Sequence, residues 1–587
     1  MKKIHGIDKE IKKLKTHLTQ LQLNSKTKSM GFLLNHEVLI RKKIKVVKNL
    51  LQSLELTQEH ELYQGYFSLL NEVSTEILKL YNDENETAYQ LEEVIEEFKV
   101  EYVESGIIYV LLSKYLPMLM NSKNLSILPI HPKDEYPKAR QMKRKFYLHL
   151  GETNTGKTYQ AMKKLEQGRH GIYLAPLRLL ALENYEKMNQ DKVKCHLLTG
   201  EEEILVEGAT HISCTIEKLD LNNEYDVVVI DEVQLIQDSI RGESWTRAIL
   251  GVLSEEIHLC GAVNVRPLLI KMITECKDEY ECIDYFRNTP LQFDINPYQL
   301  NNPVKGDALI AFSKKKVLEL SRYYQDRGYK TSVIYGDLPP EVRRIQYRSF
   351  SSGESELLIS TDAIGMGVNL PIRRIVFMSI KKFDGEVVRE LNSQEVKQIA
   401  GRAGRKGIYE IGYVTCLEEY VDFIKEKLEC KDEIIEQAII GPHESLLEIR
   451  GIPLIEKVML WEQHYQDIHH YKKMDIERYL FVLTQIKRYK LSQRIQWRIM
   501  KLPINFMQVD LLNLLLVYIE EYFINGNSEL TKPRLHSDDL EMLEIHYQEV
   551  NLYYAFSKAF QLEFDLSWVY RERSKVSKKL NYLLLRL

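Results

Sequence analysis

The segment FYLHLGETNTGKTYQAMKKL, residues 146–165, constrains the fold more than any other part of this sequence. Gly151 and Gly156 enclose four residues, and Lys157 and Thr158 follow at once, which fits the phosphate-binding pattern G-x-x-x-x-G-K-S/T. The glycines permit turns in which consecutive N–H groups point at an anion, and the following helix adds the positive end of its dipole. A chance match in an ordinary loop is the alternative, and the flanking strand and helix patterns argue against it.

This loop is expected to hold the phosphates of ATP. Lys157 would place its charge near the β- and γ-phosphates, and the Thr158 hydroxyl would coordinate Mg²⁺. ATP and Mg²⁺ are therefore the expected cofactors. The loop residues assigned to nucleotide binding are Gly151, Thr153, Asn154, Thr155, Gly156, Lys157 and Thr158.

A second motif, VVVIDEVQ at residues 227–234, ends an apolar run in two adjacent carboxylates. A strand that delivers Asp231 and Glu232 beside the phosphate loop forms the Walker B arrangement. We expect Asp231 to hold the Mg²⁺ together with Thr158, and Glu232 to orient or deprotonate the attacking water. Many strands end in an acid, so the pair gains its weight from the phosphate loop upstream. Gln234 is expected to link this strand to the other lobe.

The segment QEVKQIAGRAGRKG, residues 394–407, places Gln398, Arg402 and Arg405 at positions i, i+4 and i+7. On one helix these side chains share a face, and the intervening glycines let another body approach it. Two guanidiniums presented across a cleft can neutralise charge on a transferring phosphoryl group, and Gln398 can position the water. A solvated basic helix is the alternative interpretation. These three residues, with Lys157 and the two Walker B carboxylates, are the expected catalytic set.

A glycine-rich turn follows another apolar run in LISTDAIGMGVNLP, residues 358–371. Such a turn can contact both a nucleotide and the backbone of a bound strand. We therefore assign Gly365 and Gly367 to nucleotide binding and Thr361 to strand binding.

Two series of short apolar runs indicate two parallel β-sheets. FYLHL and VVVIDEV are typical of the first series, and TSVIYG and ELLISTD of the second; helical patterns separate the runs in each. We expect an α/β fold with two tandem RecA-like lobes, at residues 131–295 and 296–440. Continuous helical patterns on either side predict all-helical domains at residues 1–130 and 441–587.

Charge and composition restrict the class of protein. The formal net charge of −4 does not favour nucleic acid, although KARQMKRK at residues 138–145 concentrates five positive charges. A solvated turn accounts for that run equally well. No apolar run approaches the roughly 20 residues of a membrane span, so no membrane association is expected. The start of the chain lacks a secretory core, and its seven cysteines form no C-x-x-C pair, which favours reduced thiols and a cytoplasmic location.

Taken together, the motifs resemble those of superfamily 2 helicases. More narrowly, they are similar to the RNA helicase of the mitochondrial degradosome, the "suppressor of Var" family, and its bacterial relatives. The resemblance runs in the family's order from YPKARQMKRKFYLHLGETNTGKT at residues 136–158 to QIAGRAGR at residues 398–405, with a weaker echo at 491–505. Residues 1–125 and 510–587 show little that aligns.

The resemblance implies an ATP-driven motor on RNA that moves 3′ to 5′, opens duplexes and often works with a 3′ exoribonuclease. Its substrate would be single-stranded RNA or a 3′-tailed duplex. Loops at strand ends in both lobes would contact the phosphates, which position the strand without reading its sequence. Taken singly, each of these residues is more often a helix cap or a turn. The expected contacts are Pro176, Leu177, Arg178, Thr199, Gly200, Glu201, Thr215, Ser313, Gly336 and Thr361.

Three functions from different classes fit these motifs. The favoured one is an RNA-dependent ATPase that unwinds or remodels RNA. A DNA helicase or translocase uses the same motor, because the 2′-OH contacts that separate the polymers are not visible in motifs. The third is a nucleotide-gated RNA clamp that recruits a nuclease, although the complete set of Glu232, Gln398, Arg402 and Arg405 argues against a motor that has lost hydrolysis.

Trp245, in the segment RGESWTRA, has two interpretations. An exposed tryptophan could stack on a base of a bound strand. A buried core position is the interpretation that we favour, and the same holds for Trp497.

Overall fold

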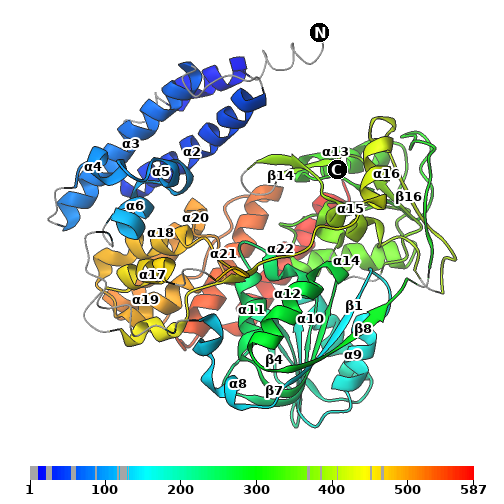
Figure 1. Ribbon diagram of the computed structural model, residues 1–587. Coiled ribbons are helices and arrows are strands. Elements are labelled where there is room, and N and C mark those ends of the chain that lie inside the picture. Colours follow the sequence, from blue (N-terminus) through cyan, green and yellow to red (C-terminus); the bar gives the residue numbers. More distant parts are fainter. Residues whose placement is uncertain are drawn as a thin grey trace.

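The structure, a computed structural model, describes residues 11–21, 29–53, 61–85, 89–115, 118, 129, 131–287, 289–365, 370–383, 387–405, 407–449, 453–464 and 468–586. Two parallel sheets lie side by side, with helical regions at both ends of the chain (Figure 1). The expected fold class, two RecA-like lobes flanked by helices, is therefore confirmed. None of the described helices combines the length and the apolar character needed to cross a bilayer.

The first sheet has eight strands in the order β4-β3-β5-β2-β6-β7-β1-β8. All neighbours are parallel except β3 and β4. Helices cover both faces, and every residue of β2 is therefore buried. The strands are β1 (Lys145–Gly151), β2 (Gly171–Ala175), β3 (Cys195–Leu198), β4 (Glu203–Ile204), β5 (His211–Thr215), β6 (Glu224–Ile230), β7 (Leu253–Gly261) and β8 (Glu279–Tyr285), and the main helices are α9 (Lys157–Leu165), α10 (Arg178–Gln190), α11 (Gly242–Gly251) and α12 (Arg266–Glu275).

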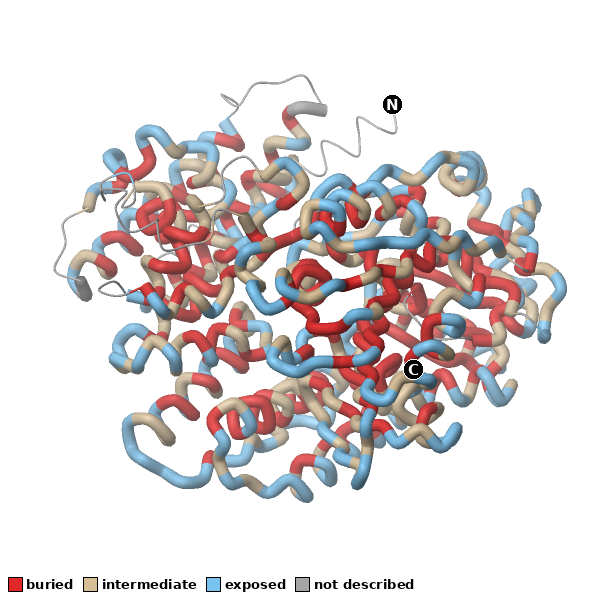
Figure 2. Tube along the Cα trace, turned by 60° about the horizontal axis from the view of Figure 1, so that its bottom comes forward, coloured by how far each residue is buried: buried red, intermediate tan, exposed pale blue. Residues whose placement is uncertain are grey.

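The second sheet has six parallel strands in the order β11-β12-β10-β13-β16-β9. Figure 2 shows buried residues concentrated in the interior of the molecule, with exposed residues around them. The strands are β9 (Leu291–Phe293), β10 (Asp307–Ile310), β11 (Thr331–Ile334), β12 (Leu357–Ser360), β13 (Arg374–Phe377) and β16 (Gly412–Cys416); the helices are α13 (Lys314–Gln325), α14 (Pro340–Ser351), α15 (Ser393–Ala400) and α16 (Val421–Glu429), and β14 (Lys381–Phe383) with β15 (Val388–Glu390) forms a hairpin.

The expected boundary at residues 295/296 differs from the observed sheets. β9 pairs with β16 in the second sheet, through Leu291 opposite Gly412. The second lobe therefore begins before residue 291. A three-residue strand is too short to show a clear alternation in the sequence, which is why the pattern placed it with the first lobe.

Helices fill the two ends of the described chain, but the C-terminal region is not all-helical as expected. A small parallel sheet joins β17 (Ala438–Ile440) to β18 (Tyr471–Lys473). The N-terminal helices are α2 (Met30–Ser53), α3 (Glu61–Asn85), α4 (Leu91–Ile95), α5 (Lys99–Ser105) and α6 (Ile107–Val110); the C-terminal helices are α17 (Leu454–Gln463), α18 (Glu477–Ile486), α19 (Gln493–Met500), α20 (Val509–Ile519), α21 (Leu540–Ala559) and α22 (Leu566–Leu584).

The last two helices form a hairpin against the second lobe (Figure 1). Leu543 of α21 and Val576 and Leu580 of α22 are buried in the same apolar cluster as residues of β11 and β13. The C-terminal end of α22 lies at α13, where the Gln325 amide donates to the Leu584 carbonyl at 3.1 Å. These residues of the hairpin therefore share the core of the second lobe. Burial of their apolar surface stabilises the contact between the hairpin and that lobe.

Candidate active site

The predicted phosphate loop joins β1 to α9. Gly156 has a φ of +86°, and a Cβ on Gly151 would lie 2.3 Å from the Tyr285 carbonyl oxygen of β8, so both positions need glycine. Lys157 is the first residue of α9. Its ammonium donates to the carbonyls of Gly151 at 2.8 Å and Glu152 at 2.5 Å, which holds it within the loop. Burial lowers the pKa of Lys157.

Asp231 lies directly after β6, beside the start of α9. Its Oδ1 accepts from the Thr158 hydroxyl at 3.1 Å, and its Oδ2 accepts from the Tyr173 hydroxyl at 2.9 Å. Burial, followed by the neighbouring Glu232, raises the pKa of Asp231 to about 6. The two expected Mg²⁺ ligands are thus adjacent, and their oxygen atoms are the donor type that Mg²⁺ prefers.

The residues after Asp231 form a compact, hydrogen-bonded turn. Glu232 has a left-handed φ of 49°, and the Gln234 amide donates to its carboxylate. Gln234 also accepts from the Ala262 N–H at 3.1 Å, so it links the turn to the residue after β7 in the same lobe, and not to the other lobe as expected. Trp245 is fully buried, and its indole N–H donates to the Asp231 carbonyl at 3.0 Å, which confirms its expected place in the core.

Residues of the second lobe reach the same place from the other side of the cleft. Gln398 and Arg402 both donate to the Gly365 carbonyl, at 3.2 Å and 3.1 Å. The Arg402 guanidinium also lies 3.7 Å from the Glu232 carboxylate. Burial lowers the pKa of Arg402, and Glu232 opposes that shift. The structure thus brings Gln398, Arg402 and Gly365 to the Walker B turn, while Gly367 lies outside the described residues.

The expectation that Gln398, Arg402 and Arg405 share one helix is wrong. α15 ends at Ala400, and Gly404 has a φ of +78°, which a continuing helix cannot accommodate. The turn that follows α15 nevertheless keeps Arg402 close to Gln398, and both donate to the Gly365 carbonyl. Arg405 lies beyond that turn, half-buried, where its charge acts on Glu183 of α10.

Direct contacts join the phosphate loop to the second lobe. The Asn154 amide donates to the Gly401 carbonyl at 2.9 Å, and a Cβ on Gly401 would lie 2.8 Å from Thr153. Arg287, in the segment between the two sheets, donates to the same carbonyl at 2.9 Å. Arg287 was not among the predicted site residues, because a lone arginine between two lobes matches no motif.

The residues expected to contact a strand occupy caps and turns in both lobes. Leu177 precedes α10, Thr215 precedes a short 3-10 helix, and the Ser313 hydroxyl accepts from the Lys316 N–H at the start of α13. Each therefore has a local structural role, and its contact with a strand stays a prediction. The remaining ones lie in similar turns: Pro176, Thr199, Gly200, Gly336 and Thr361.

Arg178 and Glu201, two further expected strand contacts, pair with each other at 2.5 Å. The Arg178 guanidinium also lies 3.1 Å from Glu202 and 3.0 Å from Glu341 of the second lobe. The Tyr547 hydroxyl of α21 donates to Glu341 at 2.6 Å. In this structure the charge of Arg178 is therefore balanced by carboxylates instead of facing solvent.

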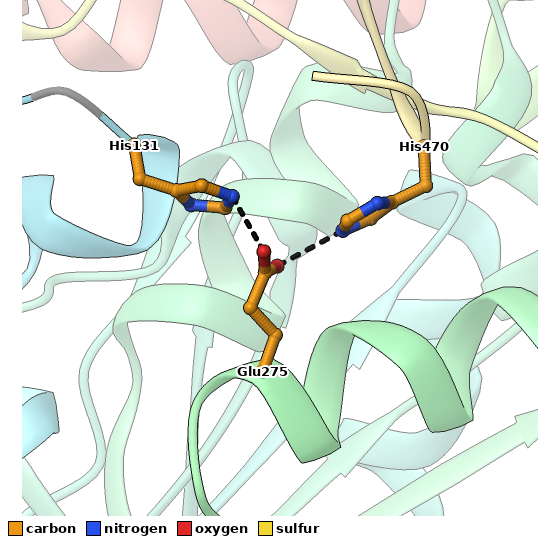
Figure 3. Close-up of side chains that lie close together, drawn as sticks. All are labelled: His131, Glu275 and His470. Carbon is orange, nitrogen blue, oxygen red and sulfur yellow. Dashed lines mark hydrogen bonds and ion pairs between the residues drawn. The ribbon is translucent and has the colours of Figure 1, made fainter. Parts of the chain in front are cut away.

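The side chains of His131, Glu275 and His470 lie close together (Figure 3). Nε2 of His131 is 2.5 Å and Nε2 of His470 is 2.9 Å from the Glu275 carboxylate. Nδ1 of His131 accepts from the Lys133 N–H, so the ring proton of the neutral imidazole is on Nε2 and points at Glu275. A metal ligand would need a lone pair there and a donor at Nδ1. These residues therefore form a hydrogen-bonded bracket between the first lobe and the C-terminal region.

Comparison with protein families covers both sheets. Residues 132–285 match the DEXQ-box helicase domain of Suv3, and residues 293–407 match the helicase conserved C-terminal domain. The DEXQ box corresponds to residues Asp231–Gln234, the turn described above.

The chain belongs to the Suv3 family of DEXQ-box helicases.

Individual Suv3-family proteins extend this similarity. "ATP-dependent RNA helicase SUV3, mitochondrial" of Saccharomyces cerevisiae is 38% identical over 350 residues, which cover 56% of this chain and 48% of the yeast protein. "DExH-box ATP-dependent RNA helicase DExH16, mitochondrial" of Arabidopsis thaliana is 42% identical over 322 residues, 54% of this chain and 56% of the plant protein. "ATP-dependent RNA helicase SUPV3L1, mitochondrial" of Homo sapiens is 34% identical over 475 residues, 76% of this chain and 60% of the human protein. The chain thus spans about half the length of these relatives.

Proposed function

We propose that this Suv3-family chain is an ATP-dependent RNA helicase that unwinds or remodels RNA during turnover. The convergence of both lobes on one cleft carries the proposal: Arg402 of the second lobe lies 3.7 Å from Glu232 of the first, beside the Thr158–Asp231 contact within the first lobe. A motor whose halves close on ATP requires such an arrangement. The names of the yeast, plant and human relatives, which describe ATP-dependent RNA helicases, support RNA as the polymer.

The first lobe would hold the nucleotide. Lys157, which now donates to carbonyls of its own loop, would turn its ammonium to the β- and γ-phosphates. Mg²⁺ suits the oxygen donors of Thr158 and Asp231 and would screen the charge of the phosphates. Glu232 would take a proton from the attacking water or orient it, because its carboxylate is fixed by Gln234.

The second lobe would complete the site only when the cleft is closed. Gln398 would orient the water, and Arg402 would neutralise charge on the transferring phosphoryl group. Arg405, which lies near Glu183, is the proposed second cation. Loss of the γ-phosphate would remove the anion that holds Lys157 and Arg402 together, so hydrolysis would release the lobes.

Cycles of closing and opening would move the protein along a strand gripped by both lobes. We propose 3′-to-5′ movement on single-stranded RNA or a 3′-tailed duplex, with the predicted loops holding phosphates, and a 3′ exoribonuclease as a partner that degrades the released strand. The cytoplasmic location expected from the sequence stays a prediction, whereas the names of the three relatives describe mitochondrial proteins.

Steady-state ATP hydrolysis with no polymer, with single-stranded RNA and with single-stranded DNA tests the proposal. We expect strong stimulation by RNA and its loss in Lys157→Ala, followed by opening of a 3′-tailed duplex. Equal stimulation by both polymers would favour a general translocase on RNA and DNA. Hydrolysis that is indifferent to either polymer would overturn the helicase and favour a nucleotide-gated clamp.

A further inference from the structure

Arg573 of α22 is a buried cation with unused hydrogen-bond donors. Its side chain is 2% exposed. Nη1 donates to the Glu201 carbonyl at 2.5 Å, whereas Nε and Nη2 have no acceptor among the described residues. Its guanidinium carbon lies 5.0 Å from the centre of the Tyr554 ring. Buried N–H groups without acceptors are costly, so an anionic ligand that reached them would be bound favourably.

The position of Arg573 indicates what that ligand is. The carbonyl that it contacts belongs to the Thr199–Glu201 turn, which the sequence assigns to the backbone of a bound strand. Thr199 closes this turn by accepting from the Glu202 N–H at 2.9 Å, and a Cβ on Gly200 would meet only Pro503, at 3.8 Å. The turn thus presents a small residue beside a buried guanidinium, which is suited to a phosphate that approaches the backbone closely.

The attachment of the hairpin explains how a strand could reach Arg573. One part of the apolar surface of α21 and α22, including Leu543 and Val576, is buried in the second lobe, and another part, including Tyr554 and Val569, lies in the cluster that the C-terminal helices share with the first lobe. Polar contacts join the hairpin to the 199–203 segment of the first lobe: Arg573 to Glu201, Tyr547 to Glu201 at 3.4 Å, and Lys558 to Glu203 at 2.8 Å. Movement of the hairpin away from the 199–203 segment would break these polar contacts and open the gap above the turn.

We propose that Arg573 is a strand-binding residue that holds one phosphodiester of a nucleic-acid strand against the Thr199–Glu201 turn. The inference rests on the proposed helicase function and deepens it, because it gives the C-terminal hairpin a place in the strand path. A guanidinium with Nε and Nη2 free offers two parallel N–H groups, which match the two non-bridging oxygens of a phosphodiester. The carboxylates of Glu201 and Glu341 pair with Arg178 and accept no hydrogen bond from Nε or Nη2 of Arg573.

Equilibrium binding of a fluorescent single-stranded RNA, without nucleotide and at several salt concentrations, tests the inference. We expect Arg573→Ala to weaken binding about tenfold and to reduce the slope of log Kd against log salt by about one, as the loss of one phosphate contact does. Arg571→Ala is the matched control, because Arg571 is on the same helix with a side chain 69% exposed. Arg573→Lys keeps the charge and should retain the slope with an intermediate Kd.

Thermal unfolding separates binding from folding. A purely structural Arg573 would lower the melting temperature in Arg573→Ala, whereas a ligand-binding residue with unused donors should leave it unchanged or raised. Wild-type affinity and slope in Arg573→Ala, or an equal loss in Arg571→Ala, would overturn the inference alone. Absence of RNA binding by the wild-type chain would overturn the proposed function as well. Inorganic phosphate at matched ionic strength should shift the melting temperatures of the wild type and Arg573→Ala equally. If Arg573→Ala alone lost this shift and kept its RNA affinity, the assignment of Arg573 to a strand would also be overturned.

Discussion

The guanidinium of Arg402 lies 3.7 Å from the carboxylate of Glu232, although the two residues belong to different lobes. Arg402 is 7% exposed, and its Nε donates to the Gly365 carbonyl at 3.1 Å. An ion pair buried across a cleft holds that cleft closed and places the cation where negative charge would develop on a γ-phosphate. The contact therefore links lobe closure to hydrolysis.

Replacement of Arg402 by alanine should lower kcat for ATP about 10³-fold, the lower end of the range for an arginine finger. Arg402→Lys should recover only part of this loss, because an ammonium cannot donate from several nitrogens in one plane. Steady-state kinetics with saturating RNA would measure the effect, with the exposed Arg322→Ala of α13 as the control. A wild-type kcat in Arg402→Ala would exclude this role.

Replacement of Gly401 by alanine should weaken ATP binding without unfolding the protein. The backbone of Gly401 has a right-handed φ of −59°, so the conformation itself accepts alanine. The new Cβ would lie 2.8 Å from Thr153 Cβ in the other lobe and 2.9 Å from the Lys397 carbonyl oxygen of α15, so the end of α15 must shift and the Asn154 contact between the lobes is strained. We expect the KM for ATP to rise about tenfold, the equivalent of 1.4 kcal/mol. Gly31→Ala, whose Cβ would lie 3.6 Å from its nearest neighbour, should leave KM unchanged.

The bracket of Figure 3 should make stability depend on pH through Glu275. Burial alone would raise the pKa of Glu275, but hydrogen bonds from His131 and His470 outweigh it and lower the pKa from 4.5 to about 2. A carboxyl whose folded pKa is depressed stabilises the fold above its unfolded pKa, and this stabilisation is lost as the pH falls through the folded value. Glu275→Gln should therefore cost about 1 to 2 kcal/mol at pH 7, after allowance for partial exposure, and progressively less below pH 4.5.

Urea unfolding of the wild type and Glu275→Gln at a series of pH values would measure that difference. Glu279→Gln, which removes an exposed carboxylate from nearby β8, is the control and should change stability little at any pH. A difference that stayed constant from pH 7 to pH 3 would contradict the assignment to Glu275.

The sequence predicted the cleft better than it predicted the surroundings of the cleft. The phosphate loop and the Walker B turn each depend on a strand followed at once by special residues, so the local pattern placed Lys157 and Asp231 correctly beside two parallel strands. The end of α15 was missed because Gly401 and Gly404 were interpreted as thin points on a helix, although a glycine with positive φ ends one.

Tertiary packing accounts for the other differences. β9 has three residues, and only its pairing with β16 assigns it to the second sheet. Arg287 acts through the Gly401 carbonyl, a backbone group that no side-chain pattern reveals. The place of α21 and α22 against the second lobe depends on which apolar faces meet, and helical periodicity gives the face but not its partner.

Trp245 should affect both stability and hydrolysis, because its indole N–H donates to the Asp231 carbonyl at 3.0 Å. Trp245→Phe removes that donor and leaves a buried carbonyl without a partner, which should cost about 1 to 3 kcal/mol of unfolding free energy. The carbonyl belongs to the peptide that leads into Glu232, whose left-handed φ of 49° requires support from its surroundings. We therefore expect kcat to fall as well, with a smaller change in KM for ATP.

Chemical denaturation and steady-state ATP hydrolysis on the same preparation would measure the two effects of Trp245→Phe. Trp568→Phe of α22 is the matched control, because Trp568 is only partly buried and lies outside the cleft. It should lose less stability and keep its kcat. If Trp245→Phe were destabilised but hydrolysed ATP at the wild-type rate, the indole would serve the core alone, and Glu232 would keep its position through Gln234 and the Ala262 N–H.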